Sequence, residues 1–278
     1  MTQLQGRNAV VTGAGSGLGA ALARTFAEAG ANVALLDIDA DAAATNAKAI
    51  ADDCGVTTTS TRVDIGDPAS VTAGAEHVRA TLGGCDILCS NVGVQQFGAV
   101  DKLTEQDWQW VVDVNVLGTV RTVREFLPML RAGSGRRHMV FTASSSVLIP
   151  SVRLAAYQTS KFAVMGFAES LREEVAGEGI GVTVMFPGPM MTRHLESSML
   201  ARPSELGESV LEMSDVDAMM AHQPMDDTDL ATPEHAIRNL LADLEAGEPY
   251  LITHGSYRPL YEQRRAAMDA AFDRMEAS

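Results

Sequence analysis

The sequence has few lysines and no surplus of positive charge. Of its 278 residues, 21 are Lys or Arg and 36 are Asp or Glu, which gives a formal net charge of −15. Nucleic acids and anionic membrane surfaces both favour clustered Lys and Arg, so the charge argues against either as a partner. The lysines are Lys48, Lys102 and Lys161. Because lysine is this scarce, each lysine position is more informative than usual.

Cysteine is also scarce, and the N-terminus has no long apolar run. Cys54, Cys85 and Cys89 are an odd number of cysteines, which does not indicate a disulfide framework. The first seven residues, Met-Thr-Gln-Leu-Gln-Gly-Arg, do not resemble a signal peptide. We therefore expect a cytoplasmic protein in which Cys85 and Cys89 are ordinary buried thiols. The six histidines show no ligand spacing, so we expect no metal site.

Linkers, internal repeats and low-complexity tracts are absent too. With 46% apolar residues and a mean hydropathy of +0.03, the chain can bury a sizeable core as one α/β domain over residues 1–278. Apolar, β-branched runs alternate with helical patterns. The predicted strands are 8–12, 32–37, 57–64, 86–91, 138–143, 181–186 and 250–253. The predicted helices are 17–30, 41–54, one beginning at Pro68, 104–131, 154–178 and about 257–276.

Most of these strands are apolar throughout, which predicts a parallel sheet covered on both faces. A doubly wound architecture follows, and its ligand site should lie beyond the carboxyl ends of the strands, where the strand order reverses.

The first strand runs into a glycine-rich turn, Thr12-Gly-Ala-Gly-Ser-Gly-Leu-Gly19, which opens a helix. It has the form T-G-x-x-x-G-x-G through Gly13, Gly17 and Gly19. Glycines allow positive φ and close backbone approach to a ligand, and the helix offers free N–H groups to an anion. The alternative is a turn needed only for tight packing of the strand on the helix.

Asp37 ends the second strand, which is the next strand in the chain after the glycine turn. A carboxylate there can bond the ribose hydroxyls of a dinucleotide and repel a 2′-phosphate. Asp39 and Asp41 add negative charge, and no Lys or Arg follows closely in the chain. These residues favour NAD over NADP.

Tyr157 and Lys161 are four residues apart in the predicted helix 154–178, so their side chains share one face. A nearby ammonium favours phenolate and lowers a tyrosine pKa that begins near ~10. Proton transfer to or from an alcohol benefits from that shift. Taken alone, the spacing also fits an ordinary surface pair.

Several further motifs follow in order between about residue 5 and residue 192. They are Asp64 after the third strand, Ser90-Asn-Val-Gly93, Asn115, Ser144, and Pro187-Gly-Pro-Met-Met-Thr192. Together with the glycine turn, Tyr157 and Lys161, they make the chain resemble a classical short-chain dehydrogenase/reductase. Ser144 precedes Tyr157 by the interval that is usual in that family. The resemblance implies a Rossmann fold.

The resemblance also implies catalytic roles. Tyr157 would be the general acid/base, and Lys161 would lower its pKa and hold the nicotinamide ribose. Ser144 would bond the carbonyl or alkoxide oxygen of the substrate. Asn115 would anchor a water that links Lys161 to solvent.

The implied cofactor is NAD. Its expected contacts, besides Tyr157 and Lys161, are Gly13, Ser16, Gly17, Leu18, Gly19, Asp37, Ile38, Asp64, Ile65, Asn91, Gly93, Pro187, Gly188, Met190 and Thr192. Some of the residues that carry the resemblance also have alternative interpretations. Asn115 fits a residue that caps or kinks its helix, Ser145 or Ser146 could stand in for Ser144, and Thr192 fits an N-cap. The family's usual Asn-Asn-Ala-Gly is Ser-Asn-Val-Gly here, so Ser90 lacks an amide and Val92 is bulkier than the usual alanine.

The irregular region from about 189 to 231 is expected to be a helical substrate lid. Eight of the 14 methionines lie between Met185 and Met225 and suit an adaptable apolar wall, although gap-filling between helices explains them equally well. The acids Glu196, Glu205, Glu208, Glu212, Asp215 and Asp217 read as its solvated face. Gln95 is a candidate substrate contact, and Arg153 is either a surface residue or a partner for a substrate carboxylate.

We therefore predict an NAD-dependent oxidoreductase that interconverts a secondary alcohol and a ketone on an apolar or aromatic substrate. The alternatives are a dehydrogenase of cyclic diols or steroid-like rings, and an NAD-binding regulator without catalysis. The family usually pairs subunits through the helices 104–131 and 154–178, so the resemblance implies a homo-oligomer, with a homotetramer as the expectation and a dimer as the alternative.

Overall fold

The computed structural model describes residues 4–207, 212–222 and 230–276. Within them, seven parallel strands form one sheet in the order β3-β2-β1-β4-β5-β6-β7. The strands are β1 (Asn8–Thr12), β2 (Asn32–Asp37), β3 (Thr58–Arg62), β4 (Ile87–Ser90), β5 (Arg137–Thr142), β6 (Ile180–Phe186) and β7 (Tyr250–Ile252). The predicted doubly wound parallel sheet is confirmed.

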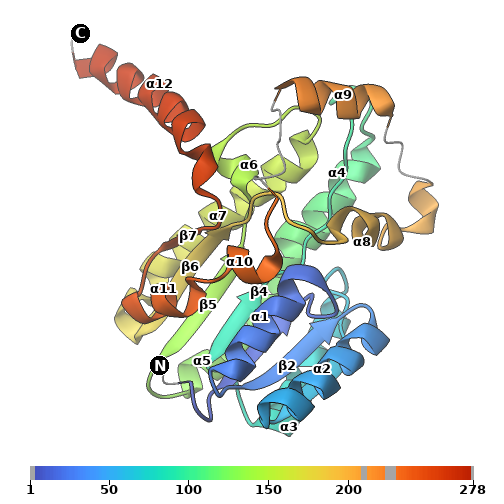
Figure 1. The fold of residues 1–278 in the computed structure, drawn as a ribbon, viewed down its shortest axis with the longest axis vertical. Coiled ribbons are helices and arrows are strands. Elements are labelled where there is room, and N and C mark those ends of the chain that lie inside the picture. The colour runs from blue at the N-terminus through green and yellow to red at the C-terminus, as the bar shows by residue number, and fades with distance from the viewer. Residues whose placement is uncertain (1–3, 208–211, 223–229, 277–278) are drawn as a thin grey trace.

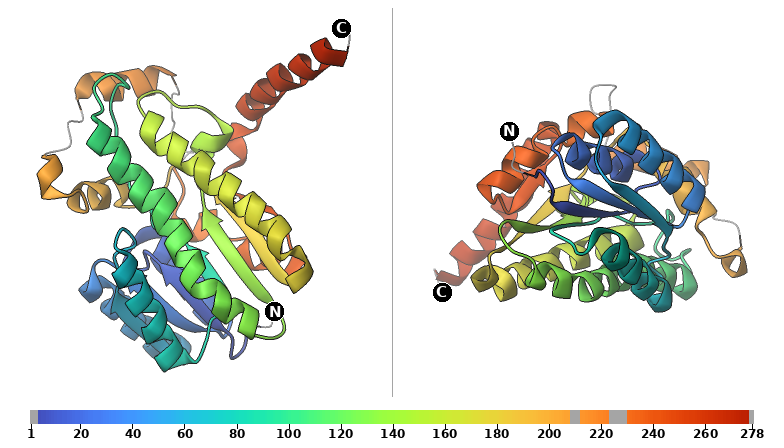
Figure 2. Two further views of the ribbon diagram at one scale, coloured as in Figure 1. Left: turned by 180° about the vertical axis from the view of Figure 1, so that it is seen from behind. Right: turned by 90° about the horizontal axis from the view of Figure 1, so that it is seen from below.

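Helices cover both faces of the sheet (Figure 1). The first part of the chain supplies α1 (Gly17–Glu28), α2 (Ala40–Cys54), α3 (Pro68–Leu82), α4 (Glu105–Val112), α5 (Gly118–Ala132), α6 (Ser145–Leu148) and α7 (Ala155–Val175). The remainder supplies α8 (His194–Leu200), α9 (Met213–His222), α10 (Pro233–Ala236), α11 (Leu240–Ala246) and α12 (Arg258–Glu276). In the left panel of Figure 2, which is seen from behind, α3, α5 and α7 form one layer in front of the sheet, and α1 and α2 lie on its other face.

The hydrophobic core lies in two layers, one on each face. Strand β1 shows the division, because successive side chains of a strand point to opposite faces. Val10 packs in the cluster with α3, α5 and α7, whereas Ala9 and Val11 pack in the cluster with α1. All three are fully buried, which is why an uninterrupted apolar run forms this strand.

Local signals fix several helix ends. The Asp39 side chain accepts a hydrogen bond from Ala42 N at the start of α2, and Gly55 ends that helix with φ 68°. Thr104 and Asp107 form the predicted capping box at the start of α4. The predicted helix 104–131 is interrupted by a π-helical turn, η1 (Asp113–Leu117), between α4 and α5. Such π-helical turns are rare in proteins, and many of those that do occur lie at functional sites.

The strand order reverses between β1 and β4, so the loops after these two strands border a crevice at the carboxyl edge of the sheet. The last helix, α12, leaves the body of the molecule (Figure 1). In the described part of the chain, no helix combines the length and apolar character needed to cross a bilayer.

Candidate functional site

A cavity of about 1200 Å³ lies at the carboxyl edge of the sheet. With the exception of Asn115, every residue predicted to contact cofactor or substrate lines it. These residues are Gly13, Ser16, Gly17, Leu18, Gly19, Asp37, Ile38, Asp64, Ile65, Asn91, Gly93, Gln95, Ser144, Tyr157, Lys161, Pro187, Gly188, Met190 and Thr192. The fold therefore gathers side chains from across the sequence into one space.

The glycine turn needs its glycines for steric reasons. Gly13 and Gly17 have φ of 70° and 51°, which L side chains rarely adopt. A Cβ on Gly19 would lie 1.9 Å from the carbonyl oxygen of Gly13. Gly15, which was not among the predicted site residues, also lines the cavity, and a Cβ there would lie 2.8 Å from the Asp37 carboxyl group. The turn is thus a bare backbone cradle that suits a ligand approaching closely.

The Asp37 carboxylate is held by the glycine turn. Its Oδ2 accepts a hydrogen bond from Gly15 N at 2.7 Å, and its Oδ1 accepts one from Asp39 N at 2.9 Å. The strand register pairs Asp37 with Arg62 of β3, so a basic residue does stand on the neighbouring strand. Arg62 is not among the residues that line the cavity. Reading along the chain did not detect this neighbour, because α2 separates the two strands in the sequence.

Tyr157 and Lys161 lie together at the inner end of the cavity, as their spacing predicts. Lys161 Nζ is 5.6 Å from the centroid of the Tyr157 ring and donates a hydrogen bond to Thr142 O at 2.9 Å. The two residues are only 7% and 2% exposed. They form an acid/base pair shielded from water.

The expected lowering of the Tyr157 pKa is wrong for this structure. Burial raises the pKa of Tyr157 to about 12, and a hydrogen bond with Ser144 acts in the opposite direction. The reason is that removing water penalises the charged phenolate. Burial also lowers the pKa of Lys161 to about 8, which still leaves most of its ammonium protonated at pH 7.

Ser144 is the serine that faces Tyr157. It is the N-cap of α6, and its Oγ accepts hydrogen bonds from Ser146 N at 3.2 Å and Ser146 Oγ at 3.0 Å. The hydrogen bond between Ser144 and Tyr157 places its hydroxyl beside the phenol. Of the three consecutive serines, Ser144 therefore fits the predicted role.

Asn115 lies behind the cavity wall, fully buried in the π-turn η1. Its Oδ1 accepts from Val94 N at 2.7 Å, and its Nδ2 donates to Val94 O at 2.9 Å and to Ser160 Oγ at 2.8 Å. A Cβ on Gly93 would lie 2.7 Å from Lys161 Nζ. Asn115 thus holds the loop that borders Lys161, and its side chain does not cap a helix.

Asn91 and Thr192 both lie beside the glycine turn. Asn91 Nδ2 donates to Thr12 O at 3.2 Å, and its Oδ1 accepts from Thr142 Oγ1 at 3.0 Å, so it joins the ends of three strands. Thr192 lies over the glycine turn, with its side chain 3.2 Å from where a Cβ on Gly17 would stand. The N-cap of α8 is Arg193, and no side chain caps this helix end. The alternative prediction that Thr192 is the N-cap is therefore wrong.

His194 is a cavity residue that sequence reasoning missed. Its ring centroid is 6.3 Å from that of Tyr157. Burial, followed by the charge of Lys161, lowers the pKa of His194 to about 4, so the imidazole is neutral near pH 7. Tyr257 also lines the cavity. Neither His194 nor Tyr257 belongs to a recognisable sequence motif. Their place in the cavity becomes visible only in the folded structure, where distant segments of the chain come together.

The methionines of the region 189–231 have two different environments. Met190, Met219 and Met220 line the cavity. Met191 and Met199, by contrast, are more than half exposed. Met225 and Glu208 lie outside the described residues. The apolar wall expected from the methionines is thus built by some of them.

Two ion pairs fasten this region to the body. Arg202 pairs with Asp107 of α4 at 2.7 Å, and both side chains are buried. Arg153 pairs with Asp215 of α9 at 3.1 Å. Asp215 is 2% exposed, so its assignment to a solvated face is wrong. Arg153 is neither a free surface residue nor available to a substrate carboxylate, because its partner is this buried acid.

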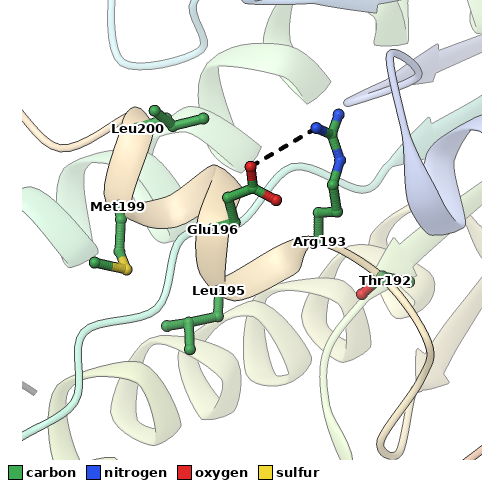
Figure 3. A pocket seen from close by; sticks show the side chains of 6 residues that line it. All are labelled: Thr192, Arg193, Leu195, Glu196, Met199 and Leu200. Carbon is green, nitrogen blue, oxygen red and sulfur yellow. Dashed lines mark ion pairs between the residues drawn. The ribbon is translucent and has the colours of Figure 1, made fainter.

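A second hollow of about 510 Å³ lies along α8 and the residues just before it (Figure 3). It is lined by Thr192, Arg193, Leu195, Glu196, Met199 and Leu200. Arg193 and Glu196 form an exposed ion pair of 3.8 Å across it. Tyr157 and Lys161 do not line this hollow, and both line the larger cavity.

Comparison with known proteins agrees with this geometry. A family model described as short chain dehydrogenase matches residues 7–202. The chain is 37% identical over 193 residues to 1-deoxy-11-beta-hydroxypentalenate dehydrogenase of Streptomyces exfoliatus, covering 68% of this chain and 69% of that protein. It is 35% identical over 191 residues to D-threitol dehydrogenase of Mycolicibacterium smegmatis, covering 68% and 72%.

A solved structure shares nearly the whole fold. It is a short chain dehydrogenase/reductase from Burkholderia phymatum in complex with NAD, with a TM-score of 0.86 and 26% sequence identity. The similarity covers 98% of this chain and 97% of that one.

Proposed function

Because the chain belongs to the short-chain dehydrogenase/reductase family of oxidoreductases, we propose that it interconverts a secondary alcohol and a ketone with NAD as hydride carrier. One observation carries this proposal. Ser144, Tyr157 and Lys161 line the same cavity as the glycine turn and Asp37. A dinucleotide fits that cavity because glycines 13, 15, 17 and 19 leave the backbone bare along it. A bound nicotinamide supplies the hydride chemistry.

The proton is moved by Tyr157. With a pKa of about 12 the phenol keeps its proton at neutral pH and can donate it to a carbonyl oxygen during reduction. In the reverse direction the Tyr157 phenolate would accept the hydroxyl proton of the alcohol. The Lys161 ammonium, 5.6 Å from the ring, stabilises the phenolate in that direction.

Ser144 fixes the reacting oxygen. Its hydroxyl is hydrogen-bonded to Tyr157 and is held in place as the N-cap of α6. A substrate oxygen between the two hydroxyls would have donors aimed at its developing charge. Asn115 supports this arrangement from behind, through its bonds to Val94 and Ser160. The completeness of this set argues against an NAD-binding regulator, which needs no proton relay.

We favour NAD over NADP because of Asp37. Its carboxylate lies in the cavity, fixed by Gly15 N and Asp39 N, where it would accept hydrogen bonds from ribose hydroxyls. A 2′-phosphate there would meet a negative charge. The solved relative in complex with NAD is consistent with this preference.

The substrate side of the cavity favours an apolar or aromatic alcohol. Its wall includes Val94, Phe97, Trp110, Met219 and Met220. Methionine side chains adapt to different shapes, which suits a cover over such a molecule. We propose that the described parts of residues 189–231 form this cover, fastened through Arg202 and Asp215.

The test is a panel of aromatic and alicyclic secondary alcohols with NAD and, separately, NADP, followed by the absorbance of the reduced cofactor. We expect turnover of at least one apolar alcohol with NAD and much slower turnover with NADP. Turnover with NADP alone would contradict the role of Asp37. Turnover restricted to small, polar polyols would contradict the apolar substrate.

A further inference from the structure

Helix α12 projects from the body of the molecule (Figure 1), and several of its apolar side chains are exposed. It spans 19 residues, and none of them is buried. Tyr261, Met268 and Phe272 are 41%, 58% and 70% exposed. Helices in proteins take most of their stability from packing an apolar face, so a helix of this kind calls for something to cover it.

These three residues form one stripe. Their spacings of seven and four residues keep them on the same side of the helix. The base of the helix is fixed, because Arg264 donates hydrogen bonds to the backbone oxygens of Val147 and Leu148. Its guanidinium also lies 5.1 Å from the ring centroid of Phe162. The stripe therefore points in a set direction.

The charge along α12 changes sign at its middle. Residues 258–266 contain three Arg and one Glu, a net charge of +2, and residues 267–276 contain three acids and one Arg, a net charge of −2. This order opposes the helix dipole, which favours acids near the N-terminus and bases near the C-terminus. An antiparallel copy of the same helix would place each half against the opposite charge.

We propose that α12 pairs with α12 of a second copy of this chain, antiparallel and about a two-fold axis near position 267. In this register Met268 lies about two residues along the axis from Met268 of the second copy, and Tyr261 lies about one residue from its Phe272. An interface of this kind is isologous, so one sequence supplies both sides. The stripe on one copy therefore packs against the same stripe on the other.

The flanking charges agree with the same axis. Arg258 and Glu276 are equidistant from position 267, as are Arg265 and Asp269, and all four lie on one side of the stripe at helical spacing. Within its own helix, Arg258 pairs with Glu262 at 2.9 Å and Arg265 with Asp269 at 3.6 Å. Such exposed pairs contribute little to stability, so they do not prevent contacts to a second copy.

Spin labels on the full chain test the pairing and its direction. A Cys54→Ser background leaves the buried Cys85 and Cys89. A label at Ala267→Cys should give an inter-copy distance below about 20 Å, and one at Arg274→Cys should give labels about 21 Å apart along the axis alone, from a rise of 1.5 Å per residue. Short distances at both positions would mean a parallel pair, and no inter-copy distance at 267 would mean no pair. Either result overturns the proposal.

Matched charge variants on α12 show whether the stripe is responsible. Met268→Glu with Phe272→Glu should abolish the distance at 267 and lower the sedimentation coefficient. Ala266→Glu with Ala270→Glu, on the opposite side of the helix, should change neither. Equal effects of the two double variants, or no effect of the first, would contradict the proposal.

A complementary mixture tests the charges. Chains with Arg258→Glu and Arg265→Glu should fail to pair with themselves through α12, as should chains with Asp269→Arg and Glu276→Arg. Mixing the two should restore the distance at 267. If the mixture does not pair, the proposed register is wrong.

Discussion

Asp37 Oδ2 accepts a hydrogen bond of 2.7 Å from Gly15 N, which joins the end of β2 to the glycine turn after β1. The glycine turn and Asp37, which both indicated a dinucleotide from the sequence, are therefore in direct contact. Gly15 cannot carry a side chain there, because a Cβ would lie 2.8 Å from the carboxyl group. The acid proposed to select the cofactor is thus held by the turn proposed to bind that cofactor.

Cofactor preference should reverse when this acid is replaced. In Asp37→Ser with Ile38→Arg, the ribose hydroxyls lose a charged acceptor while a 2′-phosphate gains a cation. Loss of a charged hydrogen bond of ~1.5–3 kcal/mol corresponds to a rise in KM for NAD of about 10–100-fold. Steady-state kinetics with both cofactors measure this. Asp101→Asn, at an exposed acid that does not line the cavity, is the control and should leave the preference unchanged.

Gly19→Ala should weaken cofactor binding severely, because the new Cβ would lie 1.9 Å from the Gly13 carbonyl oxygen and force the turn apart. We expect the Kd for NADH, measured by fluorescence, to rise at least ~10-fold, in line with strain of about 1–3 kcal/mol. Gly177→Ala is the matched control, since a Cβ there meets nothing within 4 Å. Unchanged NADH binding in Gly19→Ala would contradict the cradle.

How well the sequence predicts the molecule depends on how local each feature is. Strands β1 and β2 have the predicted bounds, since buried parallel strands are simple apolar runs. The π-turn η1 was not predicted, and the partners of its Asn115 side chain, Val94 and Ser160, lie far from it in the chain. Arg62 beside Asp37 follows from strand register alone.

The same distinction holds for the site. The order and spacing of motifs predicted the residues that line the cavity, but the direction of the Tyr157 pKa shift was wrong. Burial determines that shift, and burial is a property of the packed structure. The partners Arg153 and Asp215 likewise meet only in three dimensions, because α7 and β6 lie between them in the sequence.

Arg202 should be important for holding the cover of the cavity. Arg202→Ala leaves Asp107 buried without its cation, which typically costs ~3–5 kcal/mol. We expect that loss in the free energy of unfolding measured in urea, together with faster proteolysis between residues 189 and 231. Arg193→Ala removes an exposed pair and should cost less than ~1 kcal/mol. Similar costs for the two variants would argue against the anchoring role.

Stability should fall in acid because of His138. This residue is 4% exposed, and burial lowers its pKa to about 4 from an ordinary value of 6.5. As the pH falls from about 6.5 towards 4, His138 is therefore protonated in the unfolded chain but stays neutral in the folded chain. The free energy of unfolding decreases over that pH range. The loss at pH 5 is roughly 2 kcal/mol by linkage.

His138→Gln isolates this effect, because an amide can still bond Thr183 Oγ1, the present partner of the ring at 2.8 Å. Urea denaturation at pH 7 and pH 5 should show a smaller drop in the variant than in the original chain. Equal drops in both would assign the acid sensitivity to other groups.

The most direct test of the proposed mechanism is Tyr157→Phe, assayed with the alcohol and NAD that the panel identifies. Removing the hydroxyl removes the proton acceptor while the ring still fills its buried place, so we predict that kcat falls by ~100-fold or more and that the Kd for NADH stays within about twofold. Tyr261→Phe, on exposed α12, should turn over normally. A Tyr157→Phe enzyme that turns over at the original rate would contradict the mechanism.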